Sequence, residues 1–229
     1  MQQAAFALFD FDKTLSRGDS IIPYLFYCIR RGVAPASQIF RAFHGVMRAY
    51  RHPELVSTAK SETQSIIPGR TQGEMDALAR DFFRDRLRRR FFRQGLDELA
   101  RLKAEGYRIL VVSASPACYL HLLPEFLPVD AVISTPCGMD SEGVYTGEVG
   151  ENCQGVDKPL RIAEYLAANH LTLDYDASRA YGDSRSDLPM LTLTASPTLV
   201  NPKRPLLRAL PGAPVVRWKE SSAHDPGKT

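Results

Sequence analysis

The sequence predicts an α/β fold, a Rossmann-like doubly wound parallel sheet with an inserted helical cap domain. A short apolar run in residues 1–15 predicts a strand, and from residue 94 further apolar runs alternate with helical patterns. This alternation favours a parallel sheet covered on both faces. Between them, residues 16–93 lack strand patterns and show helical periodicity. We therefore expect a core domain over 1–15 and 94–220, a helical cap domain over 16–93 and a loose tail over 221–229.

The strands and helices of the core follow from local patterns. Apolar runs predict strands, the first of which ends at a carboxylate: 5–10, 107–112, 131–134, 179–181 and 197–200. Helices are expected at 95–105, 116–123, 157–169 and 188–193. Gly106 is placed to end the first of these helices, and residues 140–143 predict a hairpin turn.

The cap region carries signals for helix starts. Pro23 falls in the first turn of a helix that begins near Ser20, where its missing N–H does no harm. His52-Pro53-Glu54 predicts a second start, and Thr71-Gln72-Gly73-Glu74 resembles a capping box. We expect three or four helices in this region.

The composition is that of an ordinary soluble globular protein, with 44% hydrophobic and 24% charged residues. No apolar run approaches the roughly 18 residues of a membrane-spanning helix. The first residues lack the basic region of a secretory signal, so a cytoplasmic location is expected. Four cysteines occur without CxxC or His-linked spacing, which favours reduced thiols over a disulfide framework or a zinc site: Cys28, Cys118, Cys137 and Cys153.

The charge is unevenly distributed. Residues 16–93 hold 15 Lys/Arg against 7 Asp/Glu, a balance of +8, and the remainder holds 14 against 19, a balance of −5. These sum to the net charge of +3. The basic cap region is suited to attracting anionic substrates.

Two polar segments follow predicted strands. Asp10 and Asp12 stand two residues apart at the end of the first strand, where one carboxylate could act as a nucleophile and the other as a proton donor. Ser113 lies in a small-residue loop that can bind a phosphate oxygen. Each has a simpler interpretation, an Asx turn for the aspartates and a helix N-cap for the serine.

Two further segments complete the pattern. Lys158 stands at the start of a helix, where the dipole disfavours an ammonium, so an anionic neighbour is expected; a solvated surface lysine is the alternative. Asp183 and Asp187 follow Gly182 in a tight turn and offer hard oxygen ligands that suit magnesium. A loop-to-helix cap is the alternative for this pair. Because the carboxyl ends of parallel strands share one edge of a sheet, the four segments can meet.

In this order and context, the segments resemble the haloacid dehalogenase superfamily of phosphohydrolases, and more narrowly the branch that includes phosphoserine phosphatase. The resemblance covers residues 10 to about 200 and includes the helical insert directly after the first motif. The Gly143–Gly147 hairpin and the Gly182–Met190 stretch are also similar to that branch. The resemblance implies a Mg²⁺-dependent phosphatase that acts on a small phosphate ester through a phospho-aspartate intermediate.

The resemblance also implies a role for each residue. Asp10 would be the nucleophile, Asp12 the general acid and later the base, and Lys158 would balance charge between the phosphate and Asp10. Mg²⁺ would be held by Asp10, Asp183 and the backbone carbonyl of Asp12, with Asp187 supporting it through water. Substrate or phosphate contacts are implied at Phe11, Thr14, Asp19, Ser113 and Ala114.

Two positions depart from the pattern of relatives that act on phosphoserine. Lys13 stands where those relatives carry Ser, and Asp19 stands where they carry the Glu that recognises the substrate amine. Asp19 could instead be an N-cap of the first cap helix. An arginine that would hold a substrate carboxylate has four unranked candidates: Arg41, Arg48, Arg51 and Arg70.

Three rival functions are considered. A phosphotransferase would pass the phosphoryl group from the same site to an alcohol instead of water. A non-catalytic relative would have no need for the charges of Asp10, Asp12, Lys158 and Asp183 together. The basic, aromatic stretch at residues 84–93 raises nucleic-acid binding, which is less favoured because its apolar spacing also suits a packed cap helix with a solvated arginine face.

Overall fold

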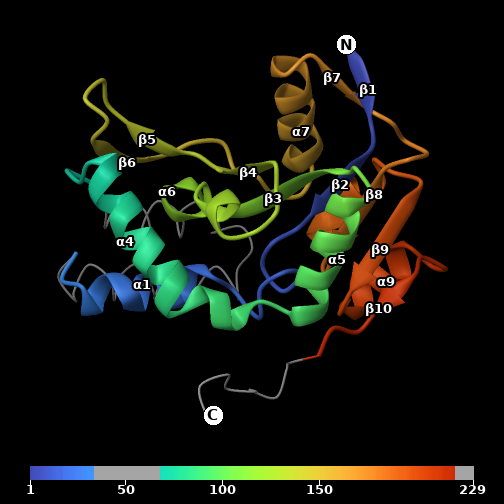
Figure 1. Cartoon of the computed structure of the whole chain (residues 1–229), viewed down its shortest axis with the longest axis horizontal. Coiled ribbons are helices and arrows are strands. Elements are labelled where there is room, and N and C mark those ends of the chain that lie inside the picture. Colours follow the sequence, from blue (N-terminus) through green and yellow to red (C-terminus); the bar gives the residue numbers. More distant parts are fainter. Residues whose placement is uncertain (34–67, 220–229) are drawn as a thin grey trace.

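The computed structural model describes residues 1–33 and 68–219. Its centre is a six-stranded sheet of parallel strands in the order β10-β9-β8-β2-β3-β4 (Figure 1). The strands are β2 (Phe6–Phe9), β3 (Arg108–Pro116), β4 (Ala131–Thr135), β8 (Arg179–Gly182), β9 (Ser196–Val200) and β10 (Val215–Val216). The predicted α/β fold with a parallel central sheet is confirmed.

Each face of the sheet has its own hydrophobic core, because side chains alternate along a strand. In β2, Phe6 and Leu8 pack with Ile162 of α7 (Asp157–Ala168) and with α8 (Leu188–Leu191) and α9 (Arg204–Ala209). Ala7 and Phe9 face the opposite core, which contains apolar residues of α5 (Arg93–Ala104). All of β2 is therefore buried, as its unbroken apolar sequence predicts.

The strand order places a crevice at the end of β2. The chain adds β3 and β4 on one side of β2, and β8, β9 and β10 on the other. In doubly wound sheets, ligands bind at such a reversal of strand order, beyond the carboxyl ends of the strands. The residues that follow β2 and β8 therefore lie where a ligand is expected.

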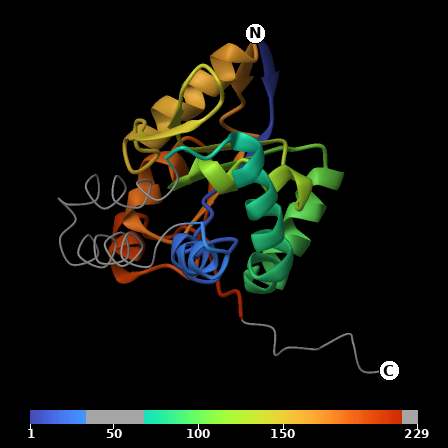
Figure 2. The ribbon, with the colours of Figure 1, turned by 90° about the vertical axis from the view of Figure 1, so that its left-hand side faces the viewer.

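The inserted region contributes helices α1 (Ile21–Arg30) and α4 (Gln72–Asp85), followed by a 3-10 helix at Leu87–Arg90. Figure 2 shows α1 and α4 side by side, and the rings of Tyr24 and Phe82 meet between them at a centroid distance of 5.1 Å. The expected helix start at His52 lies outside the described residues. The boundaries of the cap domain stay a prediction, since α1 and α4 share one buried cluster with Ala7 and Phe9 of the sheet.

A hairpin extends from the core toward the cap. Strands β5 (Cys137–Met139) and β6 (Tyr145–Val149) are antiparallel, and Gly143 takes a left-handed conformation in the predicted turn between them. Gln72 at the start of α4 donates its backbone N–H to the carbonyl of Gly143 at 2.9 Å. The hairpin and α4 therefore lie together (Figure 1).

Several elements differ from the sequence prediction. Strand β3 extends to Pro116, so the helix expected from that residue is the shorter α6 (Ala117–Leu120), followed by a 3-10 helix at Leu123–Glu125. Irregular pairing with β4 between Val112 and Pro116 accompanies this extension. The prediction also missed α9, β10 and the small parallel pair of β1 (Gln2–Ala4) and β7 (Leu171–Leu173). These elements are too short for their apolar residues to show the periodicity of a helix or a strand.

In the described part of the chain, no helix combines the length and apolar character needed to span a membrane. All four cysteines are free, which agrees with the expected reduced thiols.

Candidate active site

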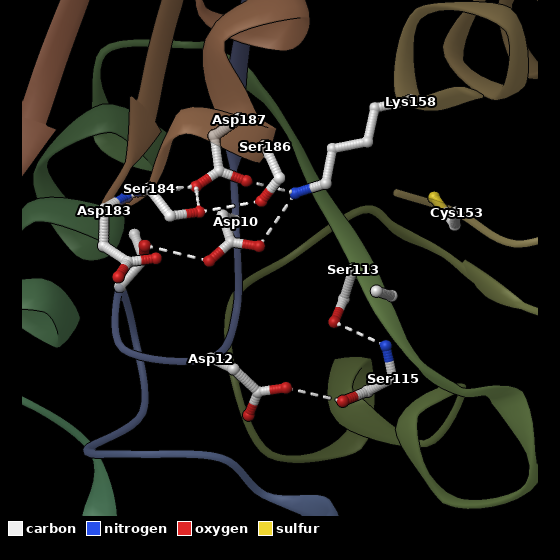
Figure 3. A network of polar contacts seen from close by, with 12 residues as sticks. Asp10, Asp12, Ser113, Ser115, Cys153, Lys158, Asp183, Ser184, Ser186 and Asp187 are labelled. Atoms are coloured by element: carbon white, nitrogen blue, oxygen red, sulfur yellow. Dashed lines mark hydrogen bonds and ion pairs between the residues drawn. The ribbon is translucent and has the colours of Figure 1, made fainter. Parts of the chain in front are cut away.

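The predicted site segments meet at the carboxyl edge of the sheet (Figure 3). Asp10 follows β2, and Asp183 follows the neighbouring strand β8. Lys158 is the second residue of α7, and Asp187 closes a 3-10 helix (Arg185–Asp187) just before α8. Lys158 and all three carboxylates are at least 93% buried.

Lys158 joins two of the carboxylates. Its Nζ donates to Asp10 Oδ1 at 2.8 Å and to Asp187 Oδ1 at 2.7 Å (Figure 3). The expectation of an anionic neighbour at the start of this helix is confirmed, and the solvated-lysine interpretation is wrong. The other oxygen of Asp10 accepts a hydrogen bond from Thr14 Oγ1 at 3.0 Å, so both of its oxygens have a donor.

Asp10, Asp183 and Asp187 form a group that could hold a metal ion. One carboxylate oxygen from each lies within 4.8 Å of the other two. Three buried carboxylates at this separation repel one another. Lys158 contacts two of them, and the exposed Lys203 Nζ lies 3.9 Å from Asp183 Oδ2. Hard oxygen donors of this kind fit a divalent cation such as Mg²⁺.

The pKa values reflect this crowding. Burial and the charge of Asp187 raise the pKa of Asp10 to about 8, although Lys158 acts in the opposite direction. Burial and Asp187 likewise raise the pKa of Asp183 to about 6. Burial alone would lower the pKa of Lys158, but Asp10 and Asp187 outweigh it and raise the pKa above its ordinary value. Lys158 is therefore held as a cation.

Asp187 is held by its own loop. Its Oδ2 accepts hydrogen bonds from the Ser184 backbone N–H and the Ser184 hydroxyl, both at 2.9 Å. Its other oxygen accepts from Lys158, so the capping interpretation is confirmed, while the role of Asp187 as a magnesium ligand stays a prediction. Gly182 is required for the close approach, since a Cβ there would lie 2.7 Å from the Asp187 Cβ.

Asp12 points away from this cluster into a network of hydroxyl groups. Its Oδ2 accepts from Ser115 Oγ at 2.5 Å and its Oδ1 from the Ser20 backbone N–H at 2.7 Å. Ser20 Oγ lies 3.3 Å from Ser115 Oγ and 2.8 Å from the Tyr119 hydroxyl. Burial raises the pKa of Asp12, although hydrogen bonds from both serines act in the opposite direction.

The sequence analysis missed this network around Asp12. Ser20 lies just before α1, whereas Ser115 and Tyr119 lie in the consecutive elements β3 and α6, so only the fold brings Ser20 to the other two. The one local signal was the repeated serine of Ser113-Ala114-Ser115, which places two hydroxyls at the end of a strand.

The residues expected to contact phosphate lie in the same region, with different exposures. Ser113 is buried within β3 and its Oγ accepts from the Ser115 backbone N–H at 3.1 Å, so the N-cap interpretation is wrong. The carbonyl of Ala114 accepts from Thr135 at 2.9 Å. The Phe11 ring is fully buried and packs edge-on against Phe91, which leaves its backbone as the group for any phosphate contact.

Asp19 forms an ion pair with Lys13. The Lys13 Nζ lies 2.8 Å from Asp19 Oδ1 and 2.7 Å from Oδ2. Ser20, not Asp19, is the N-cap residue of α1, so the capping interpretation of Asp19 is wrong. The two departures from the phosphoserine pattern are therefore in direct contact.

The candidate arginines and the basic stretch are only partly described. Arg70 donates to the carbonyl of Val33 at 3.1 Å and lies 3.9 Å from Glu74. Arg41, Arg48 and Arg51 lie outside the described residues. In the basic stretch, α4 ends at Asp85 and Leu87 is fully buried in the 3-10 helix, which supports the packed interpretation.

Comparisons with known proteins agree with this geometry. The model of the haloacid dehalogenase-like hydrolase family matches residues 7–192. A Streptomyces azureus protein named for inhibition of morphological differentiation is 37% identical over 118 residues, 49% of this chain and 41% of that protein. The match thus spans less than half the length of this relative.

Two relatives have enzymatic names. A histidinol-phosphatase of Neisseria meningitidis is 25% identical, with 93% of this chain and 98% of that protein covered. A phosphoserine phosphatase of Mycobacterium tuberculosis is 25% identical, with 86% and 65% covered.

Solved structures share the fold. A Bordetella pertussis protein of unknown function matches with a TM-score of 0.83 and 25% identity, with 94% of this chain and 99% of that chain covered. A phosphoserine phosphatase solved as a phospho-aspartyl intermediate analogue matches with a TM-score of 0.64 and 18% identity, with 95% of both chains covered. The chain therefore belongs to the haloacid dehalogenase-like hydrolases, the family that its sequence resembles.

Proposed function

We propose that this protein is a Mg²⁺-dependent phosphomonoester hydrolase that acts on a small phosphorylated metabolite through a phospho-aspartate intermediate. The observation that carries the proposal is the buried carboxylate of Asp10, which contacts Lys158 at 2.8 Å and has an oxygen within 4.8 Å of an oxygen of Asp183 and of Asp187. In this proposal Asp10 is the nucleophile, Lys158 is a fixed cation, and the three carboxylates are ligands for a second cation.

The metal proposal rests on charge balance and donor type. Asp10, Asp183 and Asp187 would hold the ion, and the backbone carbonyl of Asp12 is proposed as a further ligand. When bound, Mg²⁺ supplies positive charge that stabilises the phosphate and keeps the carboxylates ionised. This is needed at neutral pH, because burial and Asp187 raise the pKa of Asp10 to about 8.

In the first step, an oxygen of Asp10 attacks phosphorus and the bond between phosphorus and the ester oxygen breaks. Asp12 donates its proton to the leaving alkoxide. Burial raises the pKa of Asp12, which favours the protonated form required of an acid. Lys158 offsets the repulsion between the phosphate and Asp10.

In the second step, water attacks phosphorus of the acyl phosphate and Asp12, now ionised, accepts the water proton. The bond between phosphorus and the Asp10 oxygen breaks, which releases phosphate and restores both carboxyl groups. The hydroxyl of Ser115 holds Asp12 at 2.5 Å and keeps it in position for both proton transfers.

The substrate is proposed as a small alcohol phosphate bound between the core and the helical cap region. Thr14, Ser113 and the backbone at Phe11 and Ala114 are proposed to contact the phosphate, and Asp19 to contact the alcohol portion. Relatives named as phosphoserine phosphatase and histidinol-phosphatase support this size class.

Replacing Asp10 tests the proposal directly. Asp10→Asn keeps the size of the side chain but loses the nucleophilic oxygen anion, so turnover of p-nitrophenyl phosphate with Mg²⁺ should fall at least about a thousandfold. Circular dichroism should show an unchanged fold. As a matched control, Asp176→Asn alters an exposed carboxylate outside the site and should retain activity. Wild-type turnover in Asp10→Asn would remove Asp10 from the mechanism.

A further inference from the structure

Two of the four cysteines follow neighbouring strands of the sheet. Strands β3 and β4 pair in parallel, and Pro116 is the register partner of Thr135. Cys118 and Cys137 each stand two residues further along the chain, in α6 and at the start of β5. Adjacent strands lie about 4.8 Å apart, within the range of Cα separations that a disulfide accepts. The pairing of β3 with β4 therefore places the two cysteines near each other.

The two thiols are in contact. The Cys118 thiol donates a hydrogen bond to the sulfur of Cys137, and the backbone N–H groups of Ala117 and Cys118 donate to the same sulfur. These donors stabilise a thiolate and lower the pKa of Cys137, although burial acts in the opposite direction. The shared hydrogen bond and burial raise the pKa of Cys118. The pair therefore joins a nucleophilic sulfur to a thiol that keeps its proton.

Cys137 is also the cysteine that solvent can reach. It is only partly buried, whereas the other three are at most 3% exposed. Cys28 packs in the same apolar cluster, but burial raises its pKa to about 12, so it stays a thiol. Cysteines that react with oxidants have a low pKa, are accessible and often stand beside a second thiol. Cys137 meets these conditions, and Cys118 is the second thiol.

We propose that Cys118 and Cys137 form an oxidation site, at which a peroxide produces a disulfide that reversibly lowers phosphatase turnover. The effect on turnover rests on the proposed function, whereas the oxidation itself does not. Such a disulfide is transient, unlike the permanent framework of a small secreted protein.

The chemistry balances with hydrogen peroxide as the oxidant. The Cys137 thiolate attacks one peroxide oxygen, the O–O bond breaks, and the departing hydroxide takes up a proton and leaves as water. The sulfur of Cys118 then attacks the Cys137 sulfenic acid, so that the S–S bond forms and the S–O bond breaks. The second hydroxide leaves as water with the Cys118 proton. The two sulfurs together lose two electrons, and the peroxide is reduced to two waters.

The disulfide would act on the residues around Asp12. Ser115, whose hydroxyl contacts Asp12 at 2.5 Å, precedes Cys118 in the same segment. Tyr119 directly follows Cys118, and its hydroxyl lies 2.8 Å from Ser20 Oγ. Because the reduced sulfurs share a hydrogen bond and no covalent bond, joining them draws this segment toward β5. Small displacements of a group that transfers protons are costly, so turnover should fall about tenfold.

Mass spectrometry tests the oxidation site. After hydrogen peroxide treatment, the wild-type protein should lose two hydrogen atoms in mass and regain them with dithiothreitol. A protease that cleaves after glutamate separates the two cysteines at Glu125, so the disulfide should join peptides from either side of this residue. Cys118→Ser should form no disulfide and collect oxygen on Cys137. Cys137→Ser should form no disulfide either.

Cys28→Ser is the matched control. It removes a buried thiol from the same apolar cluster and should keep the disulfide and its reversal. Hydrolysis of the alkyl phosphate that the reduced protein turns over fastest with Mg²⁺ should fall about tenfold on oxidation and recover with dithiothreitol. Peroxide should leave the turnover of Cys137→Ser unchanged.

The outcomes separate the two proposals. If the reduced protein with Mg²⁺ hydrolyses no phosphate ester, the proposed function is wrong, and the peptide map still tests the oxidation site. If peroxide does not link Cys118 to Cys137, or if the linked protein keeps the turnover of the reduced protein, the proposal of this oxidation site is overturned.

Discussion

At the scale of single residues, Ser115 makes the contact that bears most directly on the proposed proton transfers of Asp12. Its hydroxyl donates to Asp12 Oδ2 at 2.5 Å, while its backbone N–H donates to Ser113 Oγ at 3.1 Å. Ser115 therefore links Asp12, the proposed general acid, to Ser113, which is proposed to bind the phosphate. A hydrogen bond of this kind favours the ionised carboxylate and so lowers its pKa.

We expect Ser115→Ala to raise the pKa of Asp12 further, because the ionised form loses a donor. The general acid would then stay protonated to higher pH, so the alkaline limb of kcat/KM should move upward while kcat falls about tenfold. The measurement is a pH–rate profile with the alkyl phosphate that the wild-type protein hydrolyses fastest. Ser115→Thr keeps the hydroxyl and should retain the wild-type limb; an unmoved limb in Ser115→Ala would contradict the role of the contact.

At the scale of elements, the start of α4 is stabilised by a reciprocal cap. Thr71 Oγ1 accepts from the Glu74 backbone N–H at 3.3 Å, and Glu74 Oε2 accepts from the Thr71 backbone N–H at 2.9 Å. The capping box predicted from the sequence is therefore confirmed. The same turn pairs with the hairpin, since Thr71 forms a β-bridge with Val144.

Thr71→Ala should lower the free energy of unfolding by about 1 kcal/mol, because one helical N–H loses its acceptor. Urea denaturation followed by circular dichroism would measure the change. Thr71→Ser keeps the acceptor and should cost less than half as much. Turnover of p-nitrophenyl phosphate at saturating substrate should stay at the wild-type value in both variants, since neither alters the carboxylate cluster; equal stability of the two variants would contradict the capping role.

At the scale of the whole molecule, the carboxylate cluster couples stability to pH and to metal. The pKa of Asp10 is raised to about 8 and that of Asp183 to about 6, both above the ordinary value of 3.8. Above pH 3.8 the unfolded chain therefore loses these protons before the folded chain does. Without metal, the contribution of the cluster to stability should fall as the pH rises toward about 8.

Magnesium should reverse this loss, because it binds the ionised carboxylates of the folded state. The rise in Tm on adding Mg²⁺ to protein treated with a chelator should be larger at about pH 8 than at about pH 5. Thermal scans in both buffers, with and without Mg²⁺, measure the difference. Asp183→Asn should show a smaller rise at both values, and a rise independent of pH in the wild-type protein would contradict the prediction.

Much of the fold could be predicted from the sequence, because its signals are local. The run Phe6–Phe9 predicts a strand buried on both faces, and it lies at the centre of the sheet. The helix at Asp157–Ala168 was predicted to within one residue. The short strands and α9 were missed, since elements of two to six residues are determined by their neighbours more than by their own pattern.

The sequence by itself determined the α/β fold and which charged residues stand at the ends of strands and helices, because both follow from periodicity and order along the chain. Only the tertiary structure decided that Lys158 contacts Asp10 and Asp187, that Asp12 joins Ser115 and Ser20, and that Lys13 pairs with Asp19. Contacts between segments as far apart as 148 residues depend on how the sheet and helices pack, which no local pattern records.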